Sequence, residues 1–292
     1  MSEGVMRPPS SSGKPLLAIE DLHVSFPSRK GLVEAVRGIS FSLGREKLGI
    51  VGESGSGKSM TGRAILRLVA RPGIVRAKRM EFDGIDLQRA SEAELRQIRG
   101  QRISMVMQDP KFSLNPVMRV GEQIAEAYRT HQKVPQAEAR RRGLEMLKAV
   151  RIRDPERVYR AYPHEVSGGM GQRIMIAMML IPDPDLLIAD EPTSALDVTV
   201  QLQVLAILDD LVTQRGMGLI FISHDLNLVA SFCDRVVIMY AGRVMEICDA
   251  KNLDAARHPY TRGLLNCLPR IDGDGSDLAV LRRDPAWMEQ GL

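Results

Sequence analysis

The sequence predicts an α/β fold with a mostly parallel β-sheet, and three observations lead to this prediction. Short apolar runs of strand length alternate with helical patterns along much of the chain, an order typical of parallel sheets covered by helices on both faces. Near the N-terminus, residues 17–43 instead show alternating apolar side chains, which predicts an antiparallel β subdomain. Residues 109–168 are polar and helical in pattern, which predicts a helical subdomain inserted into the α/β core.

Local patterns justify the individual elements in turn. Apolar residues alternate from Leu17 to Phe26 and again from Ile39 to Leu43, with a turn-prone stretch at 27–31 between them. Ser91 and Glu94 form a capping box for a helix that runs through residue 97. Further strands are predicted at 48–51, 103–107, 185–189 and 219–222, and helices at 58–70, 121–128, 136–150, 172–180 and 200–211. Strands at 236–240 and 243–247 flank Ala241-Gly242, which is a hairpin signal.

Composition narrows the class of protein. The 292 residues suffice for one large domain or two modest ones, and 44% apolar with 26% charged residues is typical of a globular protein. The formal charge of +4 is too small to indicate nucleic-acid binding, so no nucleic-acid partner is predicted. The sequence contains no run of eighteen apolar residues that would predict a membrane span. Residues 1–14 are rich in Pro, Ser and Gly and are predicted to form a flexible tail.

Residues 52–59 fit G-x-x-x-x-G-K-[ST], the phosphate-binding loop of nucleoside triphosphatases. The glycines allow the backbone N–H groups to point at phosphate oxygens, and the N-terminus of the following helix adds its dipole. Lys58 places a positive charge near the β- and γ-phosphates, and the Ser59 hydroxyl can bind Mg²⁺. The predicted nucleotide-binding residues of this segment are Gly52, Glu53, Ser54, Gly55, Ser56, Gly57, Lys58, Ser59 and Met60.

An apolar strand that ends in Asp190 and Glu191 suggests the residues that bind Mg²⁺ and activate water for hydrolysis. Asp190 is predicted to hold Mg²⁺, directly or through water, and Glu191 to polarise the attacking water. A solvated acidic turn is the alternative, and a buried strand beside two carboxylates argues against it. Gln108 ends another predicted strand and could contact Mg²⁺ or the lytic water, although a merely polar strand end fits the local pattern equally well.

Three further features are candidates for the nucleotide site only because of the motifs around them. Ser167-Gly168-Gly169 precedes a helix and could bind an anion, but by itself it reads as a helix cap. His224 follows a predicted strand and could donate to a γ-phosphate, whereas most single histidines in such places are structural. Phe26 could stack on adenine, or it could be an ordinary core aromatic.

Taken in order, these segments resemble the nucleotide-binding subunit of ATP-binding-cassette (ABC) transporters over roughly residues 16–270. The matching motifs are an aromatic (Phe26), Walker A (52–59), a Q-loop (Gln108), a signature (166–170), Walker B (186–191), a D-loop (194–197, with Asp197) and a switch histidine (His224). The resemblance implies a P-loop NTPase (RecA-like) core in a nucleotide-binding domain at 15–270. It also implies ATP and Mg²⁺ as cofactors, with Gln108, Glu191 and His224 as catalytic residues and Ser59, Gln108 and Asp190 as metal ligands.

Several segments are similar to a narrower group, the oligopeptide, dipeptide and nickel importer ATPases. These are Met107–Pro110, Ser113–Pro116, Tyr162–Glu165 and His258–Thr261, with Met170 after the signature glycines. Two departures stand out. Gly171 replaces the arginine usual in the family, and the C-terminal extension at 246–292 has no cysteine after Arg270, so no iron–sulfur cluster is expected. The cysteines at 233, 248 and 267 show no metal-ligand spacing.

The resemblance implies a peripheral subunit on the cytoplasmic face of the cell membrane that couples ATP hydrolysis to uptake of peptides or a related small solute. Two such subunits would enclose ATP between them, with Ser167 and Gly169 of one subunit contacting the nucleotide held by the other. The implied partners are a second, related ABC ATPase, two transmembrane permeases and, indirectly, a substrate-binding protein. The alternative is a soluble ABC ATPase that is not coupled to transport. The sequence leaves the substrate open among peptides, nickel, opines and sugars.

Overall fold

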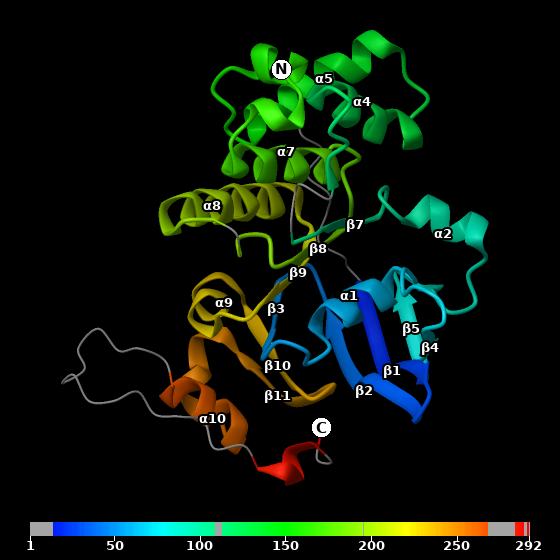
Figure 1. Cartoon of the computed structure of the whole chain (residues 1–292), viewed down its shortest axis with the longest axis vertical. Helices are drawn as coiled ribbons and strands as arrows, with labels where there is room; N and C mark the ends of the chain where they lie inside the picture. The colour runs from blue at the N-terminus through cyan, green and yellow to red at the C-terminus, as the bar shows by residue number, and fades with distance from the viewer. Residues whose placement is uncertain (1–13, 109–112, 195, 268–283, 289–290, 292) are drawn as a thin grey trace, which may run out of the picture. The chain divides into compact units, whose positions relative to one another are not determined.

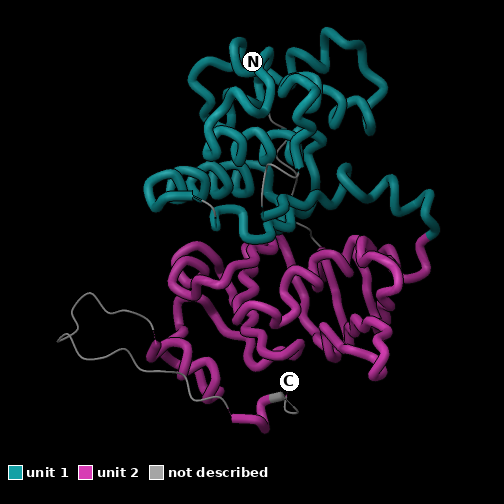
Figure 2. Tube along the Cα trace, viewed as in Figure 1, with its two compact units in different colours: residues 1–13, 91–219 teal, residues 14–90, 220–292 magenta. Residues whose placement is uncertain are grey.

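The computed structural model describes residues 14–108, 113–194, 196–267, 284–288 and 291. Residues 1–13 of the predicted N-terminal tail and most of the segment after Arg270 lie outside the described residues. The chain divides into two compact units (Figure 2): residues 91–219 form one, and residues 14–90 with 220 onward form the other. Strand β9 (Gly218–Ser223) starts in the first unit and has its larger part in the second.

The second unit contains an antiparallel sheet formed by segments of residues 17–86 (Figure 1), as the alternating pattern predicts. Its strands are β1 (Leu17–Ser28), β2 (Gly31–Leu43), β4 (Ile74–Arg76), β5 (Arg79–Phe82) and β6 (Ile85–Asp86). The order is β2-β1-β5-β6, and β4 also pairs with β1. Leu17 pairs with Leu43 and Val24 with Val36, and all four side chains are fully buried. The buried face of this sheet is therefore the alternating apolar set.

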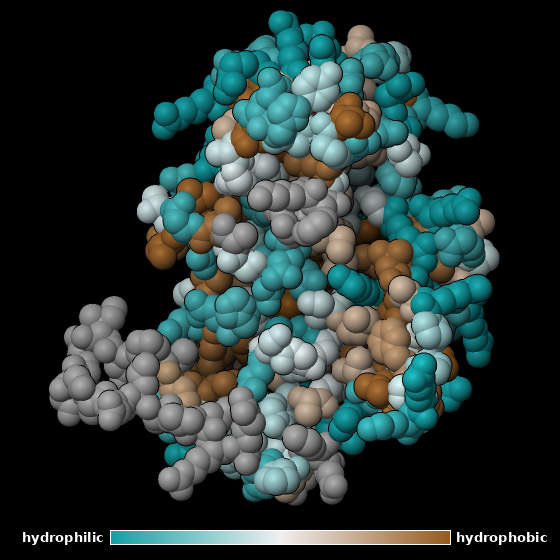
Figure 3. All heavy atoms as spheres, in the orientation of Figure 1, coloured by the Kyte–Doolittle hydropathy of each residue, from teal (hydrophilic) through white to brown (hydrophobic). Residues whose placement is uncertain are grey.

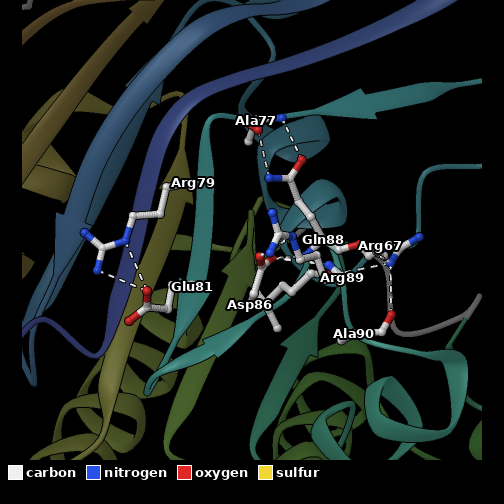
Figure 4. Close-up of polar contacts among 9 residues, drawn as sticks. Arg67, Ala77, Arg79, Glu81, Asp86, Gln88, Arg89 and Ala90 are labelled. Atoms are coloured by element: carbon white, nitrogen blue, oxygen red, sulfur yellow. Dashed lines mark hydrogen bonds and ion pairs between the residues drawn. The ribbon is translucent and has the colours of Figure 1, made fainter.

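The segment between β4 and residue 91 is held by contacts to main-chain groups (Figure 4). The Gln88 side chain donates to the Ala77 carbonyl at 2.8 Å and accepts from the Ala77 N–H at 2.9 Å. Arg67 donates to the carbonyls of Gln88, at 3.0 Å, and Ala90, at 3.2 Å. The partly exposed pair Arg79–Glu81 adds little to stability, because solvent screens it. Gln88 and Arg67 thus satisfy backbone groups where no strand partner is present.

Helix α1 (Lys58–Ile65) is shorter than the prediction of 58–70, which was wrong at its C-terminal end. Arg67 has a left-handed backbone (φ 52°), and the Leu68 N–H donates to the Arg63 carbonyl at 2.8 Å. This arrangement is a Schellman C-cap, which ends a helix. Leu68 is half exposed as a result, so the apolar residues beyond Ile65 do not continue the buried helical face.

The rest of the second unit surrounds strand β3 (Lys47–Gly52). The order β11-β10-β3-β9 includes β10 (Arg235–Tyr240) parallel to β3 and β11 (Arg243–Asp249) antiparallel to β10. Ala241 and Gly242 both have positive φ, as the predicted hairpin requires. The remaining elements are α9 (Leu226–Phe232), α10 (Pro259–Asn266) and the 3-10 helices η2 (Ala250–Ala255) and η3 (Pro285–Met288).

The first unit combines two strands with a group of helices (Figure 1). Its elements are α2 (Glu92–Ile98), β7 (Ile103–Val106), α4 (Val120–His131), α5 (Gln136–Ala149), α6 (Pro155–Arg160), η1 (Pro163–Glu165), α7 (Gly168–Leu180), β8 (Leu186–Asp190) and α8 (Val198–Arg215). The capping box predicted at Ser91 and Glu94 is present. Strands β7 and β8 are parallel.

Helix α7 is the centre of this unit. It contacts α4 and α5 on one side and α8 on the other, and residues 174–177 are fully buried. That burial confirms the prediction of a helix that is apolar nearly all round. The face shown in Figure 3 is mostly hydrophilic over α4 and α5. Within the described part of the chain, no helix is both long enough and apolar enough to cross a membrane.

Candidate nucleotide site

The phosphate loop connects β3 to α1, as predicted. Gly55 (φ 79°) and Gly57 (φ 97°) adopt left-handed backbone conformations that glycine reaches without strain. Gly52 has a steric reason to be glycine, because a Cβ there would lie 2.1 Å from the Met239 carbonyl oxygen. Glu53, Gly57, Ser59 and Met60 are half-buried, Ser54 and Gly55 are exposed, and Gly52, Ser56 and Lys58 are buried.

The Lys58 side chain folds back onto the phosphate loop. Its ammonium group donates to the carbonyls of Gly52, at 2.7 Å, and Glu53, at 2.8 Å, and the residue is only 5% exposed. These bonds hold the positive charge beside the loop at the N-terminus of α1, where the helix dipole also favours an anion. The loop can therefore bind a polyanionic group such as a phosphate chain.

A pocket of about 460 Å³ adjoins the start of this loop. Val51, Gly52 and Glu53 line it together with His224–Asn227 and Leu264. Asp225 is the N-cap of α9, and its Oδ1 accepts from the Leu228 N–H at 3.1 Å, which sets the turn that carries His224. The structure thus places His224 in the same pocket as the first residues of the phosphate loop.

Phe26 does not line this pocket. It lies on β1 opposite Val33, and a Cβ on Gly73 would approach its ring to 2.8 Å. The half-buried ring thus packs closely on the backbone at Gly73.

In the first unit, Gln108 and Glu191 meet through the register of two strands. Val106 pairs with Ala189 in the parallel β7–β8 ladder, so the residues that follow leave the sheet at the same edge. There the Gln108 amide donates to the Glu191 carboxylate at 2.9 Å. Glu191 has a left-handed backbone (φ 46°), which is costly for a residue with a side chain and is concentrated at functional sites. Asp190 ends β8 and is 4% exposed.

The signature segment starts helix α7. Ser167 is the N-cap, and its hydroxyl accepts from the Met170 N–H at 3.3 Å, while Gly168 is exposed. Asp197 caps α8 in the same way, since its Oδ1 accepts from the Val200 N–H at 3.0 Å. The helix-cap reading of Ser167 is therefore realised, and capping still leaves its first-turn N–H groups at an exposed helix end. Ala195, in the predicted D-loop, lies outside the described residues.

Gly169, in the first turn of α7, lies close to Val200, in the first turn of α8. A Cβ at this position would lie 2.6 Å from Cγ1 of Val200, a short and branched side chain that cannot move away easily. We expect Gly169→Ala to lower the free energy of unfolding by about 1–3 kcal/mol through overpacking. Val200→Ala in the same chain should restore most of the loss, as urea titrations of the two single variants and the double variant would measure. Additive losses in the double variant would contradict the steric explanation.

Sequence reasoning missed how the β10–β11 turn contacts the phosphate loop. The Gly242 N–H donates to the Ser56 carbonyl at 3.1 Å, and Met239 pairs with Gly52 in the β10–β3 ladder. The hairpin signal at residues 241–242 predicted the turn. Nothing in the pattern indicated what the turn touches, because the contact joins segments almost two hundred residues apart.

A glycine-rich loop between a strand and a helix, with an acidic pair at the end of another strand, defines a P-loop nucleoside triphosphatase. Residues 36–194 match the family model described as ABC transporter. The chain belongs to this family, and it is an ABC-type ATPase subunit of a transport system.

Relatives of known name support this assignment. The chain is 46% identical over 265 residues to the oligopeptide transport ATP-binding protein OppD of Bacillus subtilis, covering 90% of this chain and 74% of that protein. It is 47% identical over 268 residues to the dipeptide transport ATP-binding protein DppD of Escherichia coli, covering 91% and 82%.

Solved structures of cassettes have the same fold. The ATP-binding cassette MJ0796, in a dimeric post-hydrolysis state bound to ADP and Pi, matches with a TM-score of 0.71 at 26% identity, covering 80% of this chain and 99% of that one. The cassette cbiO1 of Clostridium perfringens, part of the transporter complex cbiONQ, matches with a TM-score of 0.70 at 26% identity, covering 86% and 95%. These matches establish the predicted P-loop NTPase fold, and the ATPase assignment follows from family and site together.

Proposed function

We propose that this chain powers an importer of peptides or of a chemically related small solute, as a peripheral subunit on the cytoplasmic face of the membrane. The observation that carries the proposal is the close similarity to oligopeptide and dipeptide transport ATP-binding proteins along nine-tenths of the chain. An importer subunit of this kind does not need to touch the solute. The solute is selected by a binding protein and by the permeases.

Each residue of the candidate site has a proposed task in ATP hydrolysis. Gly52–Met60 surround the phosphates, and Lys58 neutralises charge that builds up on the β- and γ-phosphates in the transition state. Glu191 orients and polarises the attacking water, with Gln108 holding the carboxylate, and His224 donates to the γ-phosphate. Phe26 stacks on the adenine ring, and Asp197 contributes through the loop before α8.

The oxygen donors of Ser59, Gln108 and Asp190 suit Mg²⁺, because this ion prefers hydroxyl, amide and carboxylate oxygens. When bound, Mg²⁺ would neutralise charge on the transferred phosphoryl group. Asp190 is buried at a strand end, where a carboxylate is costly unless cations or donors compensate it. The donor set therefore fits the ion that the proposal requires.

We further propose that the working unit contains two cassettes, with Ser167, Gly168 and Gly169 of one completing the phosphate site of the other. The exposed N-terminus of α7 suits this task, because its N–H groups and dipole favour an anion. The second cassette is proposed to be a related chain and not an identical copy. Two transmembrane permeases complete the assembly.

A pull-down of the tagged chain from its native membranes in gentle detergent tests this proposal, with mass spectrometry of the recovered proteins. Two multispanning permeases with a second cassette ATPase are the expected result, and the associated binding protein can then be tested for peptide binding by calorimetry. The Lys58→Ala variant serves as a control for assembly without nucleotide. Recovery of soluble partners alone would overturn the transporter proposal in favour of a soluble ABC ATPase.

A further inference from the structure

The C-terminal 3-10 helix η3 (Pro285–Met288) carries the chain's one tryptophan into an aromatic cluster. Trp287 is 8% exposed, and its ring lies 5.8 Å from Tyr260, 6.3 Å from Tyr240 and 6.2 Å from His258, measured between ring centroids. Tyr240 and Tyr260 are themselves 4.7 Å apart. Aromatic rings at these separations attract one another beyond the effect of the apolar area that they bury. The cluster therefore holds η3 at a defined position.

One side of the cluster belongs to the hairpin that contacts the phosphate loop. Tyr240 is the last residue of β10, between Met239, which packs on Gly52, and the turn whose Gly242 N–H donates to the Ser56 carbonyl. A shift of Tyr240 would move one or both of these contacts. The backbone position of the phosphate loop thus depends on Met239 and Gly242, which lie on either side of Tyr240 in the sequence.

The other side of the cluster belongs to α10, which the motif His258–Thr261 begins. The His258 ring nitrogen accepts from the Tyr260 N–H at 3.1 Å, and Glu246 of β11 accepts from the N–H of His258 at 3.2 Å. Tyr260 is fully buried, and one turn later Leu264 lines the pocket shared by Glu53 and His224. Tyr260 therefore sets the position of a wall of that pocket.

We propose that Trp287 is a positioning residue for the nucleotide site, because it packs at once on the hairpin that braces the phosphate loop and on the helix that walls the adjoining pocket. The inference rests on the nucleotide site proposed above. Trp287 is not among the residues that line the pocket. Its removal loosens Tyr240 and Tyr260, so the loop samples conformations in which its N–H groups no longer converge, and nucleotide affinity falls.

The test uses the full chain with Trp287→Ala, Trp287→Phe and, as a matched control on the same 3-10 helix, Ala286→Ser at an exposed position. We expect Trp287→Ala to raise the Kd and the KM for ATP about fivefold or more, the range of ordinary coupling between sites. Because the catalytic groups are untouched, kcat should stay within about twofold. Trp287→Phe, which keeps an aromatic ring, and Ala286→Ser should bind ATP as the unaltered chain does.

An unchanged Kd for ATP in folded Trp287→Ala would overturn the positioning role. This holds even if the variant shows a lower kcat or a lower stability. Lys58→Ala separates the two proposals, because it should weaken ATP binding whether or not Trp287 has a positioning role. If the unaltered chain failed to bind ATP, both proposals would fall.

A measurement on the unaltered chain covers the case in which Trp287→Ala does not fold. Trp287 is the one source of tryptophan emission, so acrylamide quenching reports its exposure directly. Linkage requires ATP to favour the docked segment if docking favours ATP. We expect ATP, at a concentration that saturates the unaltered chain but occupies little of Lys58→Ala, to lower the quenching constant of the unaltered chain and to leave that of Lys58→Ala nearly unchanged. Equal quenching with and without ATP in the unaltered chain would overturn the proposal.

Discussion

Glu191→Gln is expected to lower the rate of ATP hydrolysis by a factor on the order of 10²–10⁴, the usual contribution of a positioned general base. The amide has nearly the same shape as the carboxylate, so the site keeps its geometry and loses only the ability to polarise water. ATP binding should persist, and the chain with its partner cassette should accumulate in a nucleotide-bound closed state. Steady-state turnover, equilibrium ATP binding and gel filtration with ATP would measure the three effects.

A matched control for this variant is Glu145→Gln on α5. Glu145 forms an ion pair with Arg141, and both side chains are about half exposed, so the pair adds little to stability. The control should hydrolyse ATP at the rate of the unaltered chain. Turnover near that rate in Glu191→Gln would show that another group activates the water.

Lys58→Ala is expected to weaken ATP binding about tenfold or more, because hydrogen bonds to charged groups contribute about 1.5–3 kcal/mol each. Two effects combine in this variant. The positive charge beside the loop is lost, and the carbonyls of Gly52 and Glu53 lose the donor that holds them inward. Both changes leave the loop with a poorer fit to a phosphate chain, so substrate binding falls together with turnover.

Titration with a fluorescent ATP analogue would measure this affinity, with Lys78→Ala as the control. Lys78 is an exposed lysine of the same unit, between β4 and β5, so its removal changes the net charge equally without touching the loop. An ATP affinity in Lys58→Ala equal to that of Lys78→Ala would contradict the role assigned to Lys58.

The sequence by itself was sufficient for the phosphate loop, the capping box at Ser91 and the hairpin turn at Ala241-Gly242. These features depend on backbone conformations and hydrogen bonds within a few residues, so residue type and spacing specify them. The helices around α7 were predicted for a similar reason, since their apolar periodicity reflects burial over several turns. Local rules failed at the end of α1, where the backbone at Arg67 turns left-handed despite an apolar continuation.

Tertiary structure decided the features that join distant segments. The short strands β4 and β5 form because they pair with β1, and β6 forms because it pairs with β5. Segments of two to four residues carry too little sequence pattern to predict such strands. The contact between Gln108 and Glu191 depends on the register of β7 and β8, across 83 residues of chain. The packing of Trp287 on Tyr240 and Tyr260 likewise joins residues that are far apart in the sequence. In each case the free energy comes from long-range pairing and burial, which no local sequence pattern records.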